Sequence, residues 1–237
     1  MAQNGSSTSH SRSSWARIAT RVRWSLKRSL KGSVGMAGKK SQVYQFKVTL
    51  LDIGPPIWRR IQVPAAYTFW ELHVAIQDAM GWQDYHLHMF RIEDPRKGEV
   101  VEIGIPDEER FEDDSPHIPG WEVPISDYFL DRGSRADYLY DFGDGWEHHV
   151  VLEDIVTRVA KSKYPKCVAG ARACPPEDCG GIGGYENLLR VIRDPSDEEY
   201  ASMMEWLGGN YEPDAFDPRK VRFDNPKKRW ATAFEDS

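Results

Sequence analysis

The sequence has no run of about 18 apolar residues, few cysteines and, in its first forty positions, no acidic side chain. Without a long apolar run, the chain is not expected to cross a membrane. The N-terminus also lacks the apolar core of a secretory signal, because cations interrupt every candidate stretch. Three cysteines, an odd number, do not make a secreted disulfide framework. These absences predict a cytoplasmic protein without a membrane span.

The charge of the chain is divided unevenly between a short basic part and a long acidic part. Residues 1–40 carry nine Lys or Arg and no Asp or Glu, although the 237 residues together have a net charge of −6. The remainder therefore has 22 basic and 37 acidic residues, a net charge of −15. A body this acidic repels a phosphate backbone over most of its surface. DNA contact is therefore expected mainly through the basic part.

We predict that residues 1–40 form a disordered tail in front of one domain at residues 41–237. The tail begins as Ser-rich low-complexity sequence and continues with apolar residues spaced three or four apart between cations. The alternative is a basic amphipathic helix that lies on DNA or on an anionic membrane surface. The side chains that would contact nucleic acid are Arg17, Arg21, Arg23, Lys27 and Arg28.

From Val43 onward the pattern is regular and predicts an α+β fold. Apolar alternation indicates a hairpin of strands at 43–51 and 57–63, and Thr68 with Glu71 forms a capping box for a helix that Gly81 ends. Beyond this hairpin–helix unit we expect strands at 86–92, 99–103, 138–142 and 146–152, a short element at 123–130, a loop at 164–184, and helices at 185–192 and from 196. The fold class is therefore a single α+β domain with a mostly antiparallel sheet and C-terminal helices.

Two histidines lie two residues apart in the segment 85–90. On a strand, residues two apart share a face, so His86 and His88 would point the same way. A pair of imidazoles on one face is half of a metal site, because neutral imidazole is a common ligand. Without a recognised third ligand, the favoured interpretation is two half-buried histidines packed on aromatic rings.

The segment 140–149 combines carboxylates, glycines and histidines around an expected hairpin turn. Asp141 and Asp144 are expected to stabilise the turn, and a role as paired catalytic carboxylates has no visible partner. His148 shares a face with Trp146, Val150 and Leu152, which predicts a core-facing, hydrogen-bonded imidazole. These residues enter the candidate polar site without a catalytic assignment.

The most unusual segment is 167–184, which holds all three cysteines and a run of glycines before a helix. Cys167, Cys174 and Cys179 could supply most of a zinc site, with a histidine as fourth ligand. Their spacing is not the tight knuckle of structural zinc, so unligated cysteines are the favoured alternative. Glu177 and Asp178 complete the candidate polar site, and they would repel phosphate from the glycine run.

Three segments together resemble one known family. They are Pro55-Pro56-Ile57-Trp58-Arg59-Arg60, the hairpin at 141–148 and the cysteine segment at 174–181. Over about residues 43–234 the chain is similar to the plasmid pRiA4b ORF-3-like family. The resemblance implies an α+β domain that is often carried on plasmids and insertion sequences. It implies no established activity and no catalytic residue.

Some relatives on transposable elements are labelled resolvases, which raises the question of DNA recombination. The segment 15–20 faintly resembles the opening of a serine recombinase, but Ala19 occupies the position of the nucleophile. The arginine cluster and the helix-turn-helix that such enzymes need are not recognisable. Recombinase catalysis is therefore not expected.

Three functions follow as ranked hypotheses. The first is a non-catalytic accessory or interaction protein of a plasmid or insertion element, with an unknown protein partner. The second is a metal-binding protein or hydrolase that uses the three histidines His86, His88 and His148 with the 167–179 segment. No cofactor follows firmly from the sequence, and zinc is the ion that such a site could hold. The third is a DNA-binding accessory of transposition that acts through the basic tail.

Overall fold

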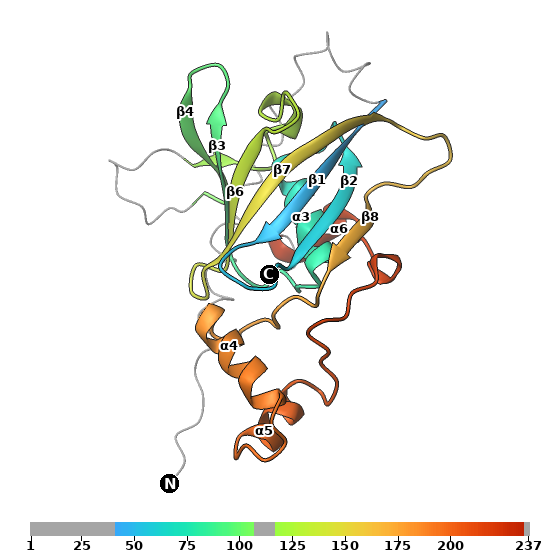
Figure 1. Ribbon diagram of the computed structural model, residues 1–237. Coiled ribbons are helices and arrows are strands. Elements are labelled where there is room, and N and C mark those ends of the chain that lie inside the picture. Colours follow the sequence, from blue (N-terminus) through green and yellow to red (C-terminus); the bar gives the residue numbers. More distant parts are fainter. Residues whose placement is uncertain (1–40, 107–116, 235–237) are drawn as a thin grey trace.

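An eight-stranded sheet forms the body of the computed structural model, which describes residues 41–106 and 117–234 (Figure 1). The strand order is β5-β4-β3-β6-β7-β1-β2-β8, and all neighbours are antiparallel except β4 and β5. The strands are β1 (Gln42–Leu50), β2 (Trp58–Pro64), β3 (His88–Asp94), β4 (Glu99–Gly104), β5 (Ile118–Pro119), β6 (Arg135–Tyr140), β7 (Trp146–Thr157) and β8 (Lys166–Ala171). The predicted α+β fold with a mostly antiparallel sheet is confirmed.

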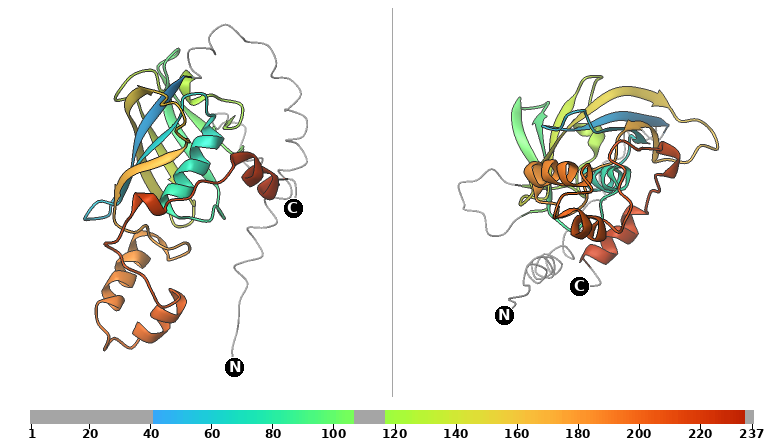
Figure 2. Two further views of the ribbon diagram at one scale, coloured as in Figure 1. Left: turned by 90° about the vertical axis from the view of Figure 1, so that its right-hand side faces the viewer. Right: turned by 60° about the horizontal axis from the view of Figure 1, so that its bottom comes forward.

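One helix, α3 (Phe69–Met80), covers one face of the sheet (Figure 2). Its start is the predicted capping box, in which Thr68 and Glu71 satisfy each other's backbone N–H groups. Its end is Gly81, whose φ of 96° is the left-handed conformation that glycine adopts without strain. The apolar side chains of α3 meet the inward side chains of β1, β2 and β3, and this contact forms the main core.

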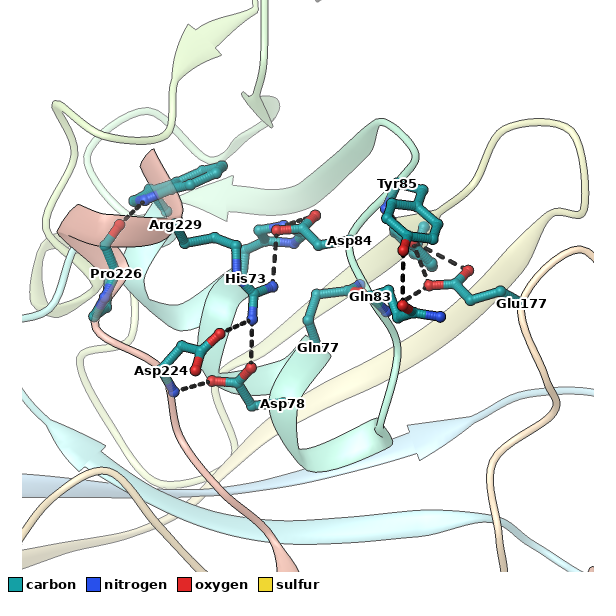
Figure 3. Close-up of polar contacts among 12 residues, drawn as sticks. His73, Gln77, Asp78, Gln83, Asp84, Tyr85, Glu177, Asp224, Pro226 and Arg229 are labelled. Carbon is teal, nitrogen blue, oxygen red and sulfur yellow. Dashed lines mark hydrogen bonds and ion pairs between the residues drawn. The ribbon is translucent and has the colours of Figure 1, made fainter. Parts of the chain in front are cut away.

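A further helix, α6 (Pro226–Phe234), packs beside α3 and was not foreseen from the sequence. Trp230 lies edge-on to Trp70 with ring centroids 5.3 Å apart, in a small second core. Arg229 donates to Asp78 at 2.8 Å and Asp224 at 2.6 Å and lies 3.3 Å from Asp84 (Figure 3). Tertiary contacts of this kind, rather than helix periodicity, determine where α6 lies.

Two helices lie away from the sheet beyond its lower end, α4 (Gly181–Ile192) and α5 (Tyr200–Trp206) (Figure 1). Single 3-10 turns occur at η1 (Ile125–Asp127), within the predicted short element, and at η2 (Pro218–Lys220). Within the described ranges, no helix is long and apolar enough to span a bilayer.

The structure corrects three local predictions. The segment 164–184 is not all loop, because residues 166–171 pair with β2 as the edge strand β8. The helix expected from 196 begins only at Tyr200, as α5, and the Ser196 hydroxyl donates to Asp194 in the turn before it. Strand β3 begins at His88, so His86 precedes it and the two imidazoles do not share a strand face.

Candidate metal centre

Three loops meet at the end of the sheet where α4 begins, and each contributes one potential metal ligand. His86 precedes β3, Asp141 follows β6, and Asp178 precedes α4. The His86 Nε2 atom lies 2.9 Å from Asp178 Oδ1 and 3.5 Å from Asp141 Oδ2. The three ligand atoms all lie within 4.8 Å of one another. Ligand atoms held at about 2.1 Å from one ion lie roughly 3 to 4 Å apart, and the two distances from His86 Nε2 agree with this spacing.

Asp141 is held in place by the hairpin turn that the sequence predicts. Its Oδ1 atom accepts the backbone N–H of Gly143 at 2.9 Å and that of Asp144 at 3.2 Å. The second oxygen, Oδ2, is the one that faces His86. The φ of Asp141 is 55°, a left-handed conformation that aspartate tolerates better than most residues. The turn therefore fixes the carboxylate and leaves one oxygen for a ligand.

The loop that carries Asp178 is tied to the same hairpin. The Asp144 carboxylate accepts the backbone N–H of Gly180 at 3.2 Å. A Cβ on Gly184 would lie 1.8 Å from the Cys179 carbonyl oxygen, and one on Gly181 would lie 2.6 Å from that of Asp144. The glycine run is therefore required for the loop to turn back tightly on α4 and on the hairpin.

Glu177 supports this loop from the inside. Its Oε1 atom accepts the backbone N–H of Gln83 at 2.7 Å (Figure 3). The same atom accepts the hydroxyl of Tyr140 at 3.0 Å. Burial raises the pKa of its carboxyl above the ordinary value, although these hydrogen bonds oppose the shift. Gln83 lies in the loop after α3 and Tyr140 ends β6, so Glu177 ties the loop of Asp178 to both and is not one of the three potential ligands.

The three potential ligands differ in their access to solvent. The side chain of Asp141 is 9% exposed, that of His86 is 23% exposed and that of Asp178 is 66% exposed. One side of the group is therefore buried in the fold, and the other faces water. A metal held here would keep open coordination positions on the solvent side.

Comparisons with known proteins place the chain in a family. The family model described as plasmid pRiA4b ORF-3-like protein matches residues 42–220. The chain belongs to this family. A curated relative, the uncharacterized protein y4hQ of Sinorhizobium fredii, is 37% identical over 171 residues, which cover 72% of this chain and 83% of that protein.

A solved structure also resembles this pRiA4b ORF-3-like protein. It is the protein of unknown function MM3350 from Methanosarcina mazei Go1, with a TM-score of 0.70 and 44% sequence identity. The match covers 77% of this chain and 98% of that chain. The names of both relatives state no activity, so the residues of the site are the evidence for function.

The other two histidines of the candidate polar site lie in the core of the pRiA4b ORF-3-like domain. His148 is fully buried, as its alternation predicts, and its Nδ1 lies 3.3 Å from the Tyr138 carbonyl oxygen. His88 stacks on His73 with ring centroids 3.4 Å apart. Burial lowers the pKa of both imidazoles, that of His148 to about 4. Both therefore act as neutral core residues away from the three ligands.

The cysteines do not assemble into a thiolate site in the part of the chain that the structure describes. Cys167 lies on β8, Cys174 and Cys179 lie in the loop that follows, and all three are free. Burial raises the pKa of each thiol, that of Cys179 to about 12. Among the described residues, the ligand atoms of His, Cys, Asp and Glu side chains that lie close enough to share one ion are those of His86, Asp141 and Asp178.

Sequence reasoning named all three potential ligands but did not join them, and it missed the residues that hold them. Tyr140 and Gln83 position Glu177, and no local pattern marks either of them as functional. The signal that was available is the pair of turn carboxylates next to glycines, Asp141 and Asp178. The predicted nucleic-acid contacts between 17 and 28 lie outside the described residues.

Proposed function

We propose that this protein binds one divalent transition-metal ion through His86, Asp141 and Asp178. The observation that carries the proposal is the convergence of three ligand atoms from three separate segments to within 4.8 Å. The backbone N–H groups around Asp141 and the Glu177 contacts hold these segments in place. The facing ligand atoms contact one another instead, with His86 Nε2 hydrogen-bonded to Asp178 Oδ1. The arrangement therefore resembles a preorganised site, in which hydrogen bonds to neighbouring groups orient the ligands.

The ligand set narrows the choice of ion. An imidazole nitrogen with two carboxylates suits zinc, manganese or iron, whereas magnesium and calcium favour oxygen ligands alone. Three protein ligands on one side with solvent on the other is the layout of sites that bind a water or a substrate as a further ligand. This layout supports a binding or hydrolytic role at the metal rather than a purely structural one.

The same contacts would also form if an N–H at His86 Nε2 donated to the two carboxylates. In that case a cation would have to displace a proton and would bind weakly. Metal titration therefore separates the two cases, because only a preorganised site competes with the proton at neutral pH.

We expect His86→Ala to weaken the binding of Zn²⁺ or Mn²⁺ at least about 100-fold, because it removes a direct ligand. Asp141→Asn should do the same while its amide oxygen still accepts the turn N–H groups. Isothermal titration calorimetry on the full chain measures both effects. The matched control is His149→Ala, since His149 also faces a carboxylate, Asp137, at 3.5 Å. Equal affinities for wild type and His86→Ala would refute the site.

An accessory role in a plasmid or insertion element stays a prediction, and the name of the family supports it. DNA contact through residues 1–40 also stays a prediction, because the tail lies outside the described residues. A cytoplasmic location also stays a prediction. The metal site is independent of all three.

A further inference from the structure

A pocket opens directly beside the proposed metal site, and the two share a residue. It has a volume of about 330 Å³ and lies between α4, α5 and the loop before α4. Asp178 lines it together with Cys179, Asn187, Leu188, Met203 and Trp206. Asp178 therefore belongs both to the wall of this pocket and to the proposed metal site.

The walls of the pocket have two different chemistries. Trp206 is 51% exposed, although large aromatic side chains in a monomer are usually covered. With Met203 and Leu188 it offers an apolar wall, and the flat indole is suited to stacking on another ring. The wall of the pocket next to the proposed metal site instead carries the carboxylate of Asp178.

The charge around the metal-site side is negative. The Asp178 carboxylate lines the pocket, and the Asp144 carboxylate accepts the backbone N–H of Gly180 in the same loop. An anion would be repelled from this part of the pocket unless a bound cation offset these charges. The site therefore selects, when loaded with metal, for a ligand with an anionic oxygen at one end.

We infer that the pocket binds a small molecule with an anionic oxygen group on a flat aromatic ring. The oxygen coordinates the ion, and the ring lies on Trp206 and Met203. This inference rests on the proposed metal site, because the anionic end requires the ion. The inference assigns a class of ligand to this site, and the description of the family names none.

Phenyl phosphate is the probe, and inorganic phosphate is its comparison, because the two share the anionic group and differ in the ring. The manganese-loaded full chain is titrated with each by calorimetry. We expect phenyl phosphate to bind about tenfold more tightly than inorganic phosphate. Trp206→Ala should abolish this preference and keep the affinity for manganese. The control Leu130→Ala removes an apolar side chain that is 50% exposed and does not line the pocket.

Each outcome separates the two proposals. If manganese does not bind at all, the metal site itself is refuted. If manganese binds but phenyl phosphate shows no preference, or if Trp206→Ala keeps the preference, the pocket inference alone is overturned. Equal phenyl phosphate binding to metal-free protein would also overturn it, because the acidic surroundings could not then require a cation.

Discussion

Replacing Arg59 with leucine is expected to lower the free energy of unfolding by about 3 to 5 kcal/mol. Arg59 is only 1% exposed and lies on the core side of β2. Its guanidinium donates to three backbone carbonyls, those of Trp58, Ala79 and Ala171, at 2.8 to 3.0 Å. It also lies 3.8 Å from the centroid of the Phe216 ring.

The position of these acceptors explains the size of the effect. The Ala79 carbonyl belongs to the last turn of α3, where the helix dipole is negative, so the buried cation both caps and complements that end. Ala171 is on the edge strand β8, so one side chain joins the helix, two strands and the segment around Phe216. Leucine would leave buried carbonyl groups without this donor.

Arg60→Leu is the matched control for this prediction. Arg60 points to the other face of the same strand and pairs with Glu153, and both side chains are partly exposed, at 32% and 23%. A pair this exposed contributes at most about 1 kcal/mol. Urea denaturation of the two variants measures the difference. If both variants lose the same free energy, Arg59 has no special role in the core.

Acid is expected to destabilise the protein between about pH 6.5 and pH 4 through its buried histidines. Burial lowers the pKa of His148 to about 4 and also lowers that of His88, which lies against His73. In this pH range the unfolded chain binds protons at these positions and the folded chain does not, so stability rises with pH. The contribution is fully present above about pH 6.5 and is lost as the pH falls. His148 alone accounts for about 3 kcal/mol of the free energy of unfolding that is lost.

The variant His148→Asn isolates this contribution. An asparagine amide can still donate to the Tyr138 carbonyl, but it does not titrate. Stability measured by urea denaturation at pH 7.5, 5.5 and 4.5 should therefore fall less steeply for the variant than for the wild type. An unchanged slope would show that His148 is not held neutral by burial.

Local signals in the sequence were sufficient for the elements that depend on local chemistry. The capping box at Thr68 and the alternation around His148 are satisfied by neighbouring residues, so both predictions are confirmed. The edge strand β8 was missed because the small residues Ala169, Gly170 and Ala171 show no apolar alternation. Its pairing with β2 comes from a distant part of the chain.

In the candidate site, too, the sequence indicated individual residues but not their contacts with distant parts of the chain. The sequence identified His86, Asp141 and Asp178 as polar residues of interest, but it assigned His86 to a strand that begins two residues later. His86 faces Asp178 because the loop before α4 approaches the sheet, a contact between residues far apart in the chain. Arg229 also has partners that its neighbours in the sequence do not indicate, because two of the three aspartates around it, Asp78 and Asp84, lie far away in the chain. Only tertiary packing could reveal these partners.

The most direct test of the metal site is anomalous diffraction from crystals of the protein grown with Mn²⁺ or Zn²⁺. We predict one strong anomalous peak within about 2.3 Å of His86 Nε2 and of one oxygen each of Asp141 and Asp178. Crystals of His86→Ala should lose this peak and retain the fold. A wild-type map with no peak at this position, or with its peak on the cysteines instead, would contradict the account.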